Sequence, residues 1–344
     1  MAIYICPRCK IKLSETDTDW QCNQCNKLYP KKSGFLSMIK ENKYWGEFSE
    51  KEMDILLNKI YSRDYQEAKT YIDKELNRKE FIFGKSRSDF IYYFNLDKDT
   101  ICLDTGCGLG ANTFNIAPYV KEVYAFDQSL KRVMFCNYRK KFEDIKNVNF
   151  CHTDFKNLPF QDNFFNVIIM NGVVEWLGEI NEFKNPRDDQ LAILRKIYTK
   201  LKKGGQIYIG IENRFASVYL TKGCDHSGLK YTSLIPRFLA NAVMKIKKGK
   251  QYRTYTYSIF GYKKLLKDSG FKSENIDYYI AYPGYNRPQY IIPFDDLQSL
   301  SFFLRNMTKK KGLLGGIVRF LSKYNLFLRI IRHFFYSYLI YIKK

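Results

Sequence analysis

The sequence has few acidic residues for its length and very few histidines. Its 344 residues include 57 Lys and Arg against 35 Asp and Glu, which gives a formal net charge of +22. Such an excess raises the affinity for polyanions, namely nucleic acid, anionic lipid or phosphorylated substrates, without choosing among them. Only three histidines are present. Few side chains can therefore serve as a base that titrates near neutral pH.

Several other features are missing. We find no internal repeat and no low-complexity tract, and we expect no signal peptide because the sequence leads directly into the first cysteine pair. Arginines interrupt the apolar C-terminal region, so a membrane-spanning helix of about 20 residues is not expected. The nine cysteines are an odd set, with four clustered near the N-terminus and five scattered. This usage favours a reduced, cytoplasmic compartment over a disulfide framework.

The segment from Asp104 to Gly110 is the most informative part of the chain. An apolar run ends in Asp104, glycines follow at alternate positions, and apolar residues resume at Phe114. This order predicts a strand, a tight turn and a helix, as in nucleotide-binding units. Gly106 and Gly108 would let the backbone approach a ligand, because a Cβ blocks both the contact and positive φ angles. No lysine follows, which argues against a P-loop.

Further apolar segments alternate with helical patterns. The segments at 123–127 and 148–154 each end in an acid, and 164–170 is almost continuously apolar, as a strand buried on both faces should be. Leu-Lys-Lys-Gly-Gly at 201–205 closes a helix before a further strand at 206–211. Alternating strands and helices of this kind predict an α/β fold with a doubly wound sheet.

Over residues 80–215 this order resembles the class I S-adenosylmethionine-dependent methyltransferases. The resemblance implies S-adenosylmethionine as cofactor, with Asp127 on the ribose and Asp154 near the adenine. An NAD-type Rossmann domain would need the spacing G-x-G-x-x-G, whereas this chain has G-x-G-x-G. The cofactor-binding residues expected from the resemblance are Asp104, Gly106, Gly108, Gly110, Asp127, Asp154, Phe155 and Asn171.

Two C-x-x-C pairs stand near the N-terminus, Cys6 with Cys9 and Cys22 with Cys25. Pairs at this separation can close one tetrahedral zinc site with four thiolates. A module of about thirty residues cannot bury enough apolar surface to fold alone, so the metal would hold it together. The alternative, a redox-active C-x-x-C motif, would be a single pair beside a βαβ unit, whereas this chain has two pairs. The module resembles the zinc ribbons of some methyltransferases, which could read RNA, dock a protein or brace the fold.

The expected organisation is a zinc ribbon at 1–40, a helical linker at 41–79, a methyltransferase domain at 80–295 and a basic amphipathic helical tail at 296–344. Residues 309–344 carry nine Lys or Arg and no acid. Apolar residues from Leu326 to Ile342 recur at helical spacing, which favours a helix lying on an anionic membrane surface. The alternative is an ordinary helix that packs on its own domain.

Methyl transfer requires alignment of acceptor and methyl group, and a hydroxyl acceptor also gains from a base. His152 lies in a strand pattern and is expected to be structural, and His333 lies in the C-terminal helical pattern. His226, next to Asp225 in the loop after the strand at 206–211, is the best candidate base, with Glu212 at the end of that strand. A loop histidine without a catalytic role remains the alternative.

Two enzymatic functions fit. The segments beginning at Glu212, Asp225 and Tyr285 are similar to methyltransferases of cell-surface polysaccharide clusters, which implies O-methylation of a glycan or lipid-linked sugar at the cytoplasmic membrane face. The alternative is an RNA base methyltransferase that holds rRNA or tRNA with its ribbon. Against it, Asn171-Gly-Val-Val replaces an amino-methylating Asn-Pro-Pro-Tyr motif. A non-enzymatic scaffold is disfavoured because the glycine loop and the three acids after the strands are intact.

Overall fold

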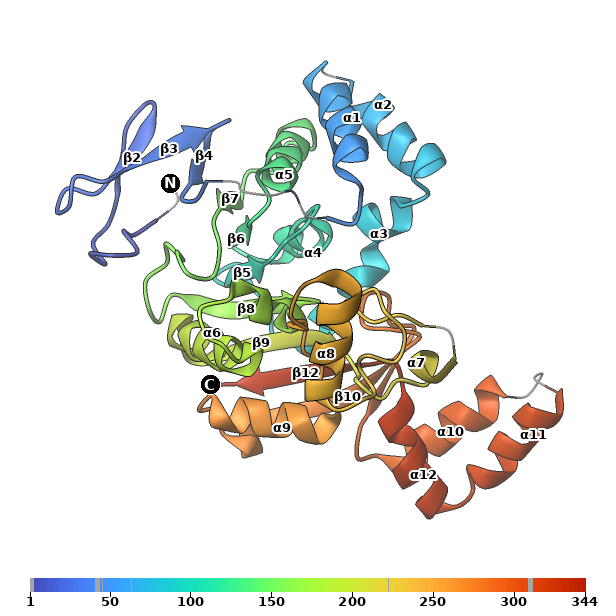
Figure 1. Cartoon of the computed structure of the whole chain (residues 1–344). Coiled ribbons are helices and arrows are strands. Elements are labelled where there is room, and N and C mark those ends of the chain that lie inside the picture. The colour runs from blue at the N-terminus through green and yellow to red at the C-terminus, as the bar shows by residue number, and fades with distance from the viewer. Residues whose placement is uncertain (1–2, 41–43, 45, 63, 222, 309–311) are drawn as a thin grey trace. The chain divides into compact units, whose positions relative to one another are not determined.

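The computed structural model describes residues 3–40, 44, 46–62, 64–221, 223–308 and 312–344 (Figure 1). The chain divides into two compact units. The first contains Met1–Met170 and Thr199–Gln206, and the second contains Asn171–Tyr198 and Ile207–Lys344.

The first unit is built on four parallel strands with helices in the crossovers. These elements are β5 (Ile101–Thr105), α4 (Ala111–Ile116), η3 (Ala117–Tyr119), β6 (Glu122–Asp127), α5 (Leu130–Phe142), β7 (Val148–His152) and β8 (Phe165–Asn171). β5 pairs with β6 on one side and with β8 on the other, and β7 extends the sheet beyond β6. Nearly all strand residues are buried, as expected for parallel strands covered on both faces. The predicted doubly wound α/β fold is confirmed.

The cysteine-rich module joins the edge of this sheet. Its strands are β1 (Ser14–Glu15), β2 (Asp19–Gln21), β3 (Leu28–Lys32) and β4 (Phe35–Ser37). β4 runs parallel to β7, with Leu36 opposite Cys151 and Ser37 opposite His152. The buried Tyr4 hydroxyl donates to the Phe150 carbonyl at 3.2 Å. The module therefore shares its apolar core with the parallel sheet.

Helices follow the module in the first unit. They are α1 (Glu50–Tyr61), α2 (Tyr65–Thr70), the π-helix η1 (Tyr71–Glu75), α3 (Lys79–Phe83) and the 3₁₀ segment η2 (Lys85–Tyr93). α1 begins at a capping box, in which the Ser49 hydroxyl accepts from the Glu52 amide and the Glu52 carboxylate accepts from the Ser49 amide at 2.7 Å. The buried stripe of Met53, Leu56 and Ile60 then follows helical spacing.

The second unit carries a sheet in the order β9-β12-β10-β11, with β10 antiparallel to both of its neighbours. Its strands are β9 (Leu201–Glu212) from Ile207 onward, β10 (Ile276–Tyr282), β11 (Tyr290–Pro293) and β12 (Ser337–Lys343). Its helices before the C-terminal segment are η4 (Val174–Ile180), α6 (Pro186–Lys200), α7 (Ser217–Thr221), α8 (Arg237–Lys248), α9 (Ile259–Asp268) and η5 (Ser273–Asn275).

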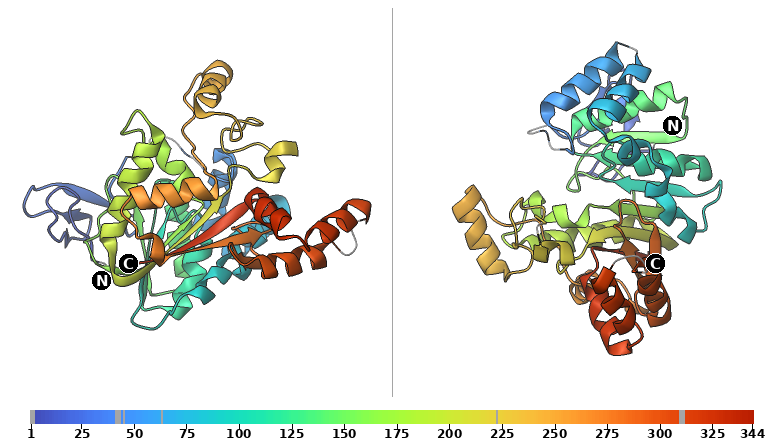
Figure 2. Two further views of the ribbon diagram at one scale, coloured as in Figure 1. Left: turned by 90° about the horizontal axis from the view of Figure 1, so that it is seen from below. Right: turned by 90° about the vertical axis from the view of Figure 1, so that its right-hand side faces the viewer.

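The C-terminal segment differs from the predicted tail. Three helices follow and form a group, drawn in orange and red in Figure 2: α10 (Leu297–Met307), α11 (Gly312–Leu321) and α12 (Asn325–Ile331). Helix α10 contacts the other two helices and β11. After the short η6 (Arg332–Phe334), the chain becomes the strand β12, so the prediction of helix through Ile342 is wrong. β12 is rich in aromatic and β-branched residues and is almost wholly buried. Periodicity alone cannot separate such a short apolar run from a helix.

Within the described ranges, no helix is both long and apolar enough to cross a bilayer.

Candidate functional site

The turn after β5 has the backbone that its glycines predict. Gly106, Gly108 and Gly110 have φ angles of 60°, 55° and 80°. Side-chain-bearing residues rarely adopt these angles. A Cβ on Gly110 would also lie 2.6 Å from the Phe114 ring. In contrast, a Cβ on Gly108 would meet only a Glu47 carboxylate oxygen, at 3.6 Å. The turn thus has room beside the Gly108 Cα, although Gly108 is buried, and is packed tightly at Gly110.

Two acids fix this turn from neighbouring strands. Asp104, at the end of β5, is buried and accepts from the Thr113 hydroxyl at 2.5 Å. Burial raises the pKa of Asp104 to about 7, against the opposing effect of that hydrogen bond. Asp127, at the end of β6, accepts from the amides of Gly108 at 3.0 Å and Ser129 at 2.9 Å. Asp127 is therefore held against the glycine loop, as the cofactor assignment requires.

A buried arginine next to Asp127 was not predicted from the sequence. Arg132 on α5 lies 3.4 Å from the Asp127 carboxylate and forms a second ion pair with Glu47. Burial acts to lower the pKa of Arg132, but the two carboxylates outweigh it and raise the pKa. Arg132 offsets the charge of Asp127 inside the unit. No local pattern marks either residue, because Glu47 is distant in sequence and approaches through the fold.

The other residues assigned to the cofactor are more dispersed. Asp154 accepts from the amide and the side chain of Asn157 at 2.9 and 2.8 Å. The Phe155 ring packs edge-on against Phe126, with centroids 5.1 Å apart. Asn171 belongs to the second unit, where the Tyr208 hydroxyl donates to its side-chain oxygen at 3.1 Å. The structure therefore does not unite Asn171 with the glycine loop inside one unit.

His152 and His333 make contacts typical of structural histidines. His152 is buried in β7, with Nδ1 2.8 Å from the Ser37 hydroxyl and Nε2 3.1 Å from the Gln128 carbonyl. Burial lowers its pKa. His333 stacks on Phe260 at 5.1 Å. These contacts agree with the expectation that His152 braces the fold.

His226 lies between two acids in the second unit. Its Nε2 is 3.1 Å from Glu212 at the end of β9 and 3.6 Å from Glu175 in η4. The Trp176 ring packs against the imidazole, with centroids 4.7 Å apart. Glu175 was not among the predicted catalytic residues. The only signal for Glu175 in the sequence is its position shortly after β8.

The two acids have different environments. Glu212 accepts from the hydroxyls of Tyr219 at 2.6 Å and Tyr336 at 2.7 Å. Burial acts to raise the pKa of Glu212, but His226 and these hydroxyls lower it overall. Glu175 is fully buried, and within the described chain neither of its oxygens has a hydrogen-bond partner. Burial raises its pKa to about 7.

Both acids affect the pKa of His226. Burial acts to lower the pKa of His226, but the Glu212 and Glu175 carboxylates outweigh it and raise the pKa to about 9. The imidazolium form is therefore stabilised at neutral pH. A ring in this state stabilises negative charge, and after losing its proton it is a stronger base than an ordinary histidine.

Asp225, the predicted partner of His226, holds the loop instead. Its carboxylate accepts from the Ser227 amide at 2.8 Å, the Thr232 hydroxyl at 3.0 Å and the Tyr252 hydroxyl at 2.9 Å. In the part of the chain that the structure describes, no ion pair joins Asp225 to the imidazole. Its contacts position the loop that carries His226.

The four N-terminal cysteines converge as predicted. The sulfurs of Cys6, Cys9, Cys22 and Cys25 all lie within 4.8 Å of one another, and Cys6 and Cys25 are 3.9 Å apart. Zinc–sulfur bonds of about 2.3 Å in a tetrahedron place sulfurs about 3.8 Å apart. The Cys9 amide also donates to the Cys6 sulfur at 3.4 Å. This set of donors fits one zinc ion.

Residues 96–256 match the family model of a methyltransferase domain. A demethylmenaquinone methyltransferase from Geobacillus sp. (strain WCH70) is 28% identical over 126 residues, which cover 36% of this chain and 50% of the relative. An uncharacterised RNA methyltransferase from Mycoplasma mobile is 28% identical over 153 residues, covering 41% of each chain. A cypemycin N-terminal methyltransferase from Streptomyces sp. is 31% identical over 114 residues, covering 33% of this chain and 42% of the relative.

The chain thus spans half the length of these curated relatives or less. Over residues 96–256 the chain matches a methyltransferase domain, and this match supports the predicted enzyme class. The names of the relatives refer to a quinone, RNA and a peptide terminus, so they do not determine the acceptor.

Proposed function

We propose that this chain, with its methyltransferase domain at 96–256, methylates a hydroxyl oxygen of a glycan or lipid-linked sugar at the cytoplasmic face of a membrane. The observation that supports a hydroxyl as the methyl acceptor is the buried group formed by His226, Glu212 and Glu175. A hydroxyl must lose its proton as it becomes a nucleophile, and a buried histidine with acidic partners is suited to receive that proton.

S-adenosylmethionine fits the glycine loop of the first unit. A Cβ on Gly108 would fill the space beside the Glu47 carboxylate, and in this proposal Asp127 offers carboxylate oxygens to ribose hydroxyls. Asp154 and Phe155 would hold the adenine. When bound, the cofactor supplies an electrophilic methyl group on a sulfonium.

The second unit would handle the acceptor proton. In this proposal the neutral imidazole of His226 takes the proton from the acceptor hydroxyl, and the Glu212 carboxylate stabilises the resulting imidazolium. Tyr219 and Tyr336 keep Glu212 in place and ionised. In this proposal Glu175, whose oxygens have no hydrogen-bond partner in the described chain, accepts a hydrogen bond from a second acceptor hydroxyl that enters its buried site. A polyhydroxylated acceptor such as a sugar meets both requirements.

The segments similar to polysaccharide-cluster methyltransferases also build the surroundings of this group. Asn213 donates to the carbonyls of His333 and Phe335 at 2.7 and 2.8 Å. Arg214 donates to the Ile235 carbonyl at 2.6 Å. These two side chains tie the end of β9 to neighbouring segments, so they support the site and are not free to bind sugar.

We further propose that Cys6, Cys9, Cys22 and Cys25 bind one structural zinc ion. The ion would lock the two C-x-x-C turns, while Tyr4 and Trp20 supply the apolar contacts of the module, with ring centroids 5.1 Å apart.

A transfer assay with labelled cofactor tests the main proposal. Purified chain is incubated separately with lipid-linked sugars, free polysaccharide and rRNA, and product is identified by mass spectrometry after acid hydrolysis. We expect an O-methyl sugar that depends on His226. Methylated RNA bases with no O-methyl sugar would overturn the proposal.

RNA base methylation is the second candidate. The net charge of +22 and the similarity to an RNA methyltransferase of Mycoplasma mobile favour it. It predicts RNA binding that weakens with salt and with loss of the ribbon, and methyl transfer that does not depend on His226.

A further inference from the structure

Helix α11 exposes its apolar face. By helical spacing, four large residues share one face, and all are exposed: Leu313, Leu314, Ile317 and Phe320. The opposite face packs through small residues, because Gly315 and the following Ser322 are buried. Leu313 and Leu314 are 84% and 76% exposed. A helix that buries glycine and presents leucine to solvent has its usual amphipathic arrangement reversed.

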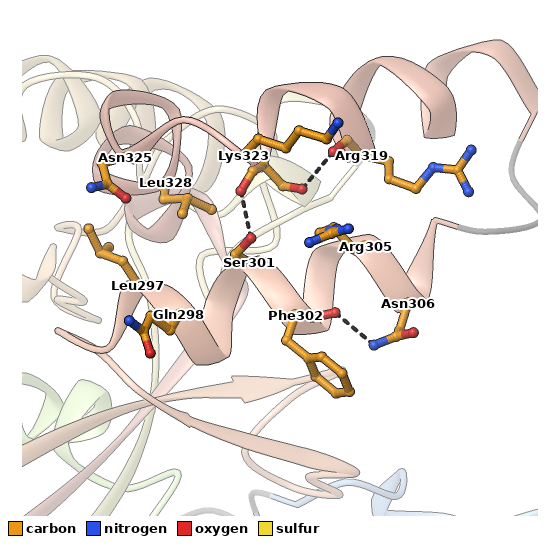
Figure 3. Close-up of a pocket in the computed structure, with 11 residues that line it drawn as sticks. Leu297, Gln298, Ser301, Phe302, Arg305, Asn306, Arg319, Lys323, Asn325 and Leu328 are labelled. Carbon is orange, nitrogen blue, oxygen red and sulfur yellow. Dashed lines mark hydrogen bonds between the residues drawn. The ribbon is translucent and has the colours of Figure 1, made fainter.

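The helical group that contains α11 is also strongly basic. Residues 297–344 contain no acid. A groove of about 710 Å³ lies between α10, α11 and α12 (Figure 3), lined in part by Arg305, Arg319 and Lys323. Within the described chain, no ion pair joins any of these three cations to an acid. The same helical group therefore contains both exposed apolar residues and cations that have no acidic partner in the described chain.

We propose that the group of helices α10, α11 and α12 docks on an anionic phospholipid membrane, with the apolar face of α11 in the bilayer interface and the groove cations attracting lipid phosphates. Apolar insertion combined with attraction to acidic headgroups is how interfacial helices bind. The inference builds on the proposed reaction at a membrane face and names the surface that makes the contact.

A second copy of the chain is a poorer occupant. Pairing two α11 faces would bring two acid-free helical groups together, each carrying the same positive charge. Like charges would then oppose the association. An anionic membrane offers apolar volume and negative charge at the same surface, so it complements both features.

Point variants test this better than truncation, because removal of the segment after Gly312 would also remove β12 from its sheet. The full chain is mixed with vesicles of phosphatidylglycerol and phosphatidylcholine, or of phosphatidylcholine alone, and bound protein is measured by co-sedimentation. The variant Leu313→Glu/Leu314→Glu changes two exposed residues. The control Leu28→Glu/Tyr92→Glu makes the same charge change at residues that are 56% and 77% exposed in the other unit.

We expect the wild type to bind phosphatidylglycerol vesicles and the α11 variant to bind at least about tenfold more weakly. The control should stay within about twofold of wild type. A groove variant, Arg305→Gln/Arg319→Gln/Lys323→Gln, should lose most of the preference for phosphatidylglycerol over phosphatidylcholine. Equal thermal unfolding and cofactor binding of all variants would show that they are folded.

Three results would overturn the inference. One is no vesicle binding by the wild type, and another is equal binding by the α11 variant. The third is a dimer, seen by light scattering, that the α11 variant abolishes without any vesicle binding, which would assign the face to a second copy. Vesicle binding needs no acceptor. A chain that binds vesicles but methylates no sugar therefore keeps this inference and loses the proposed function, and the converse result separates them equally well.

Discussion

The glycine loop of the first unit and the His226 group of the second unit hold their functional atoms in different ways. The loop uses backbone geometry within residues 104–110, supported by Asp127 from the next strand. The His226 group uses side chains from η4, β9 and a loop, with a hydroxyl from Tyr336 just before β12. The geometry of the glycine loop is set by local φ angles, and the geometry of the His226 group is set by tertiary packing. Substitutions should therefore separate cofactor binding from proton transfer.

The largest expected effect is on proton transfer. His226→Ala should lower the rate of methyl transfer to a hydroxyl acceptor by about 10²–10⁴-fold, because the buried base is removed. Cofactor affinity, measured by calorimetric titration, should not change. His333→Ala is the control and should keep full activity. If His226→Ala weakened cofactor binding instead, the two groups would not act separately.

Loss of the metal should affect the first unit. The double variant Cys22→Ser/Cys25→Ser should retain no zinc by plasma mass spectrometry, where the wild type retains one ion per chain. The melting temperature of that unit should fall by several degrees, because about 1 kcal/mol corresponds to about 2–4 °C in a unit of this size. Cys224→Ser changes an exposed thiol outside the cluster and is the matched control. Full zinc content in the double variant would rule out the assignment.

Asp127→Ala should act on the first unit, where it removes the expected ribose contact and the buried partner of Arg132. Loss of charge-assisted hydrogen bonds, worth about 1.5–3 kcal/mol, should weaken S-adenosylmethionine binding by at least about tenfold. Asp144→Asn, at an exposed acid, provides the control. Wild-type affinity in Asp127→Ala would contradict the placement of the ribose.

The smallest effect concerns pH. Because the acids raise the pKa of His226 to about 9, the neutral base becomes more populated as pH rises, and the rate should increase between pH 7 and 9. Glu175→Gln removes one of these acids, so the rising limb should move to lower pH, with a rate change at pH 7 of less than about tenfold. Glu179→Gln, at an acid in the same helix η4, is the control. A pH profile unchanged by Glu175→Gln would remove Glu175 from the proton-transfer group.

Sequence reasoning succeeded where the physical requirement is local. The glycines predicted positive φ angles, and the two C-x-x-C pairs predicted converging sulfurs. It missed contacts that only the fold creates. Glu175 meets His226, and Glu47 reaches Arg132, across long separations in the chain. Adjacency in sequence suggested Asp225 as partner of His226, yet its carboxylate turns toward Tyr252 and Thr232. Strand β12 was missed because its apolar residues fit the periodicity of a helix as well as that of a strand.

The position of β12 has a consequence for biosynthesis. This strand lies between β9 and β10, which come from much earlier in the chain. During translation the sheet of the second unit cannot close until residues 337–343 have left the ribosome, whereas the parallel sheet of the first unit has all its strands by residue 171. Tyr336 arrives together with β12 and completes the support of Glu212. A nascent or prematurely terminated chain could thus carry a finished glycine loop while its acid–base group is still unassembled.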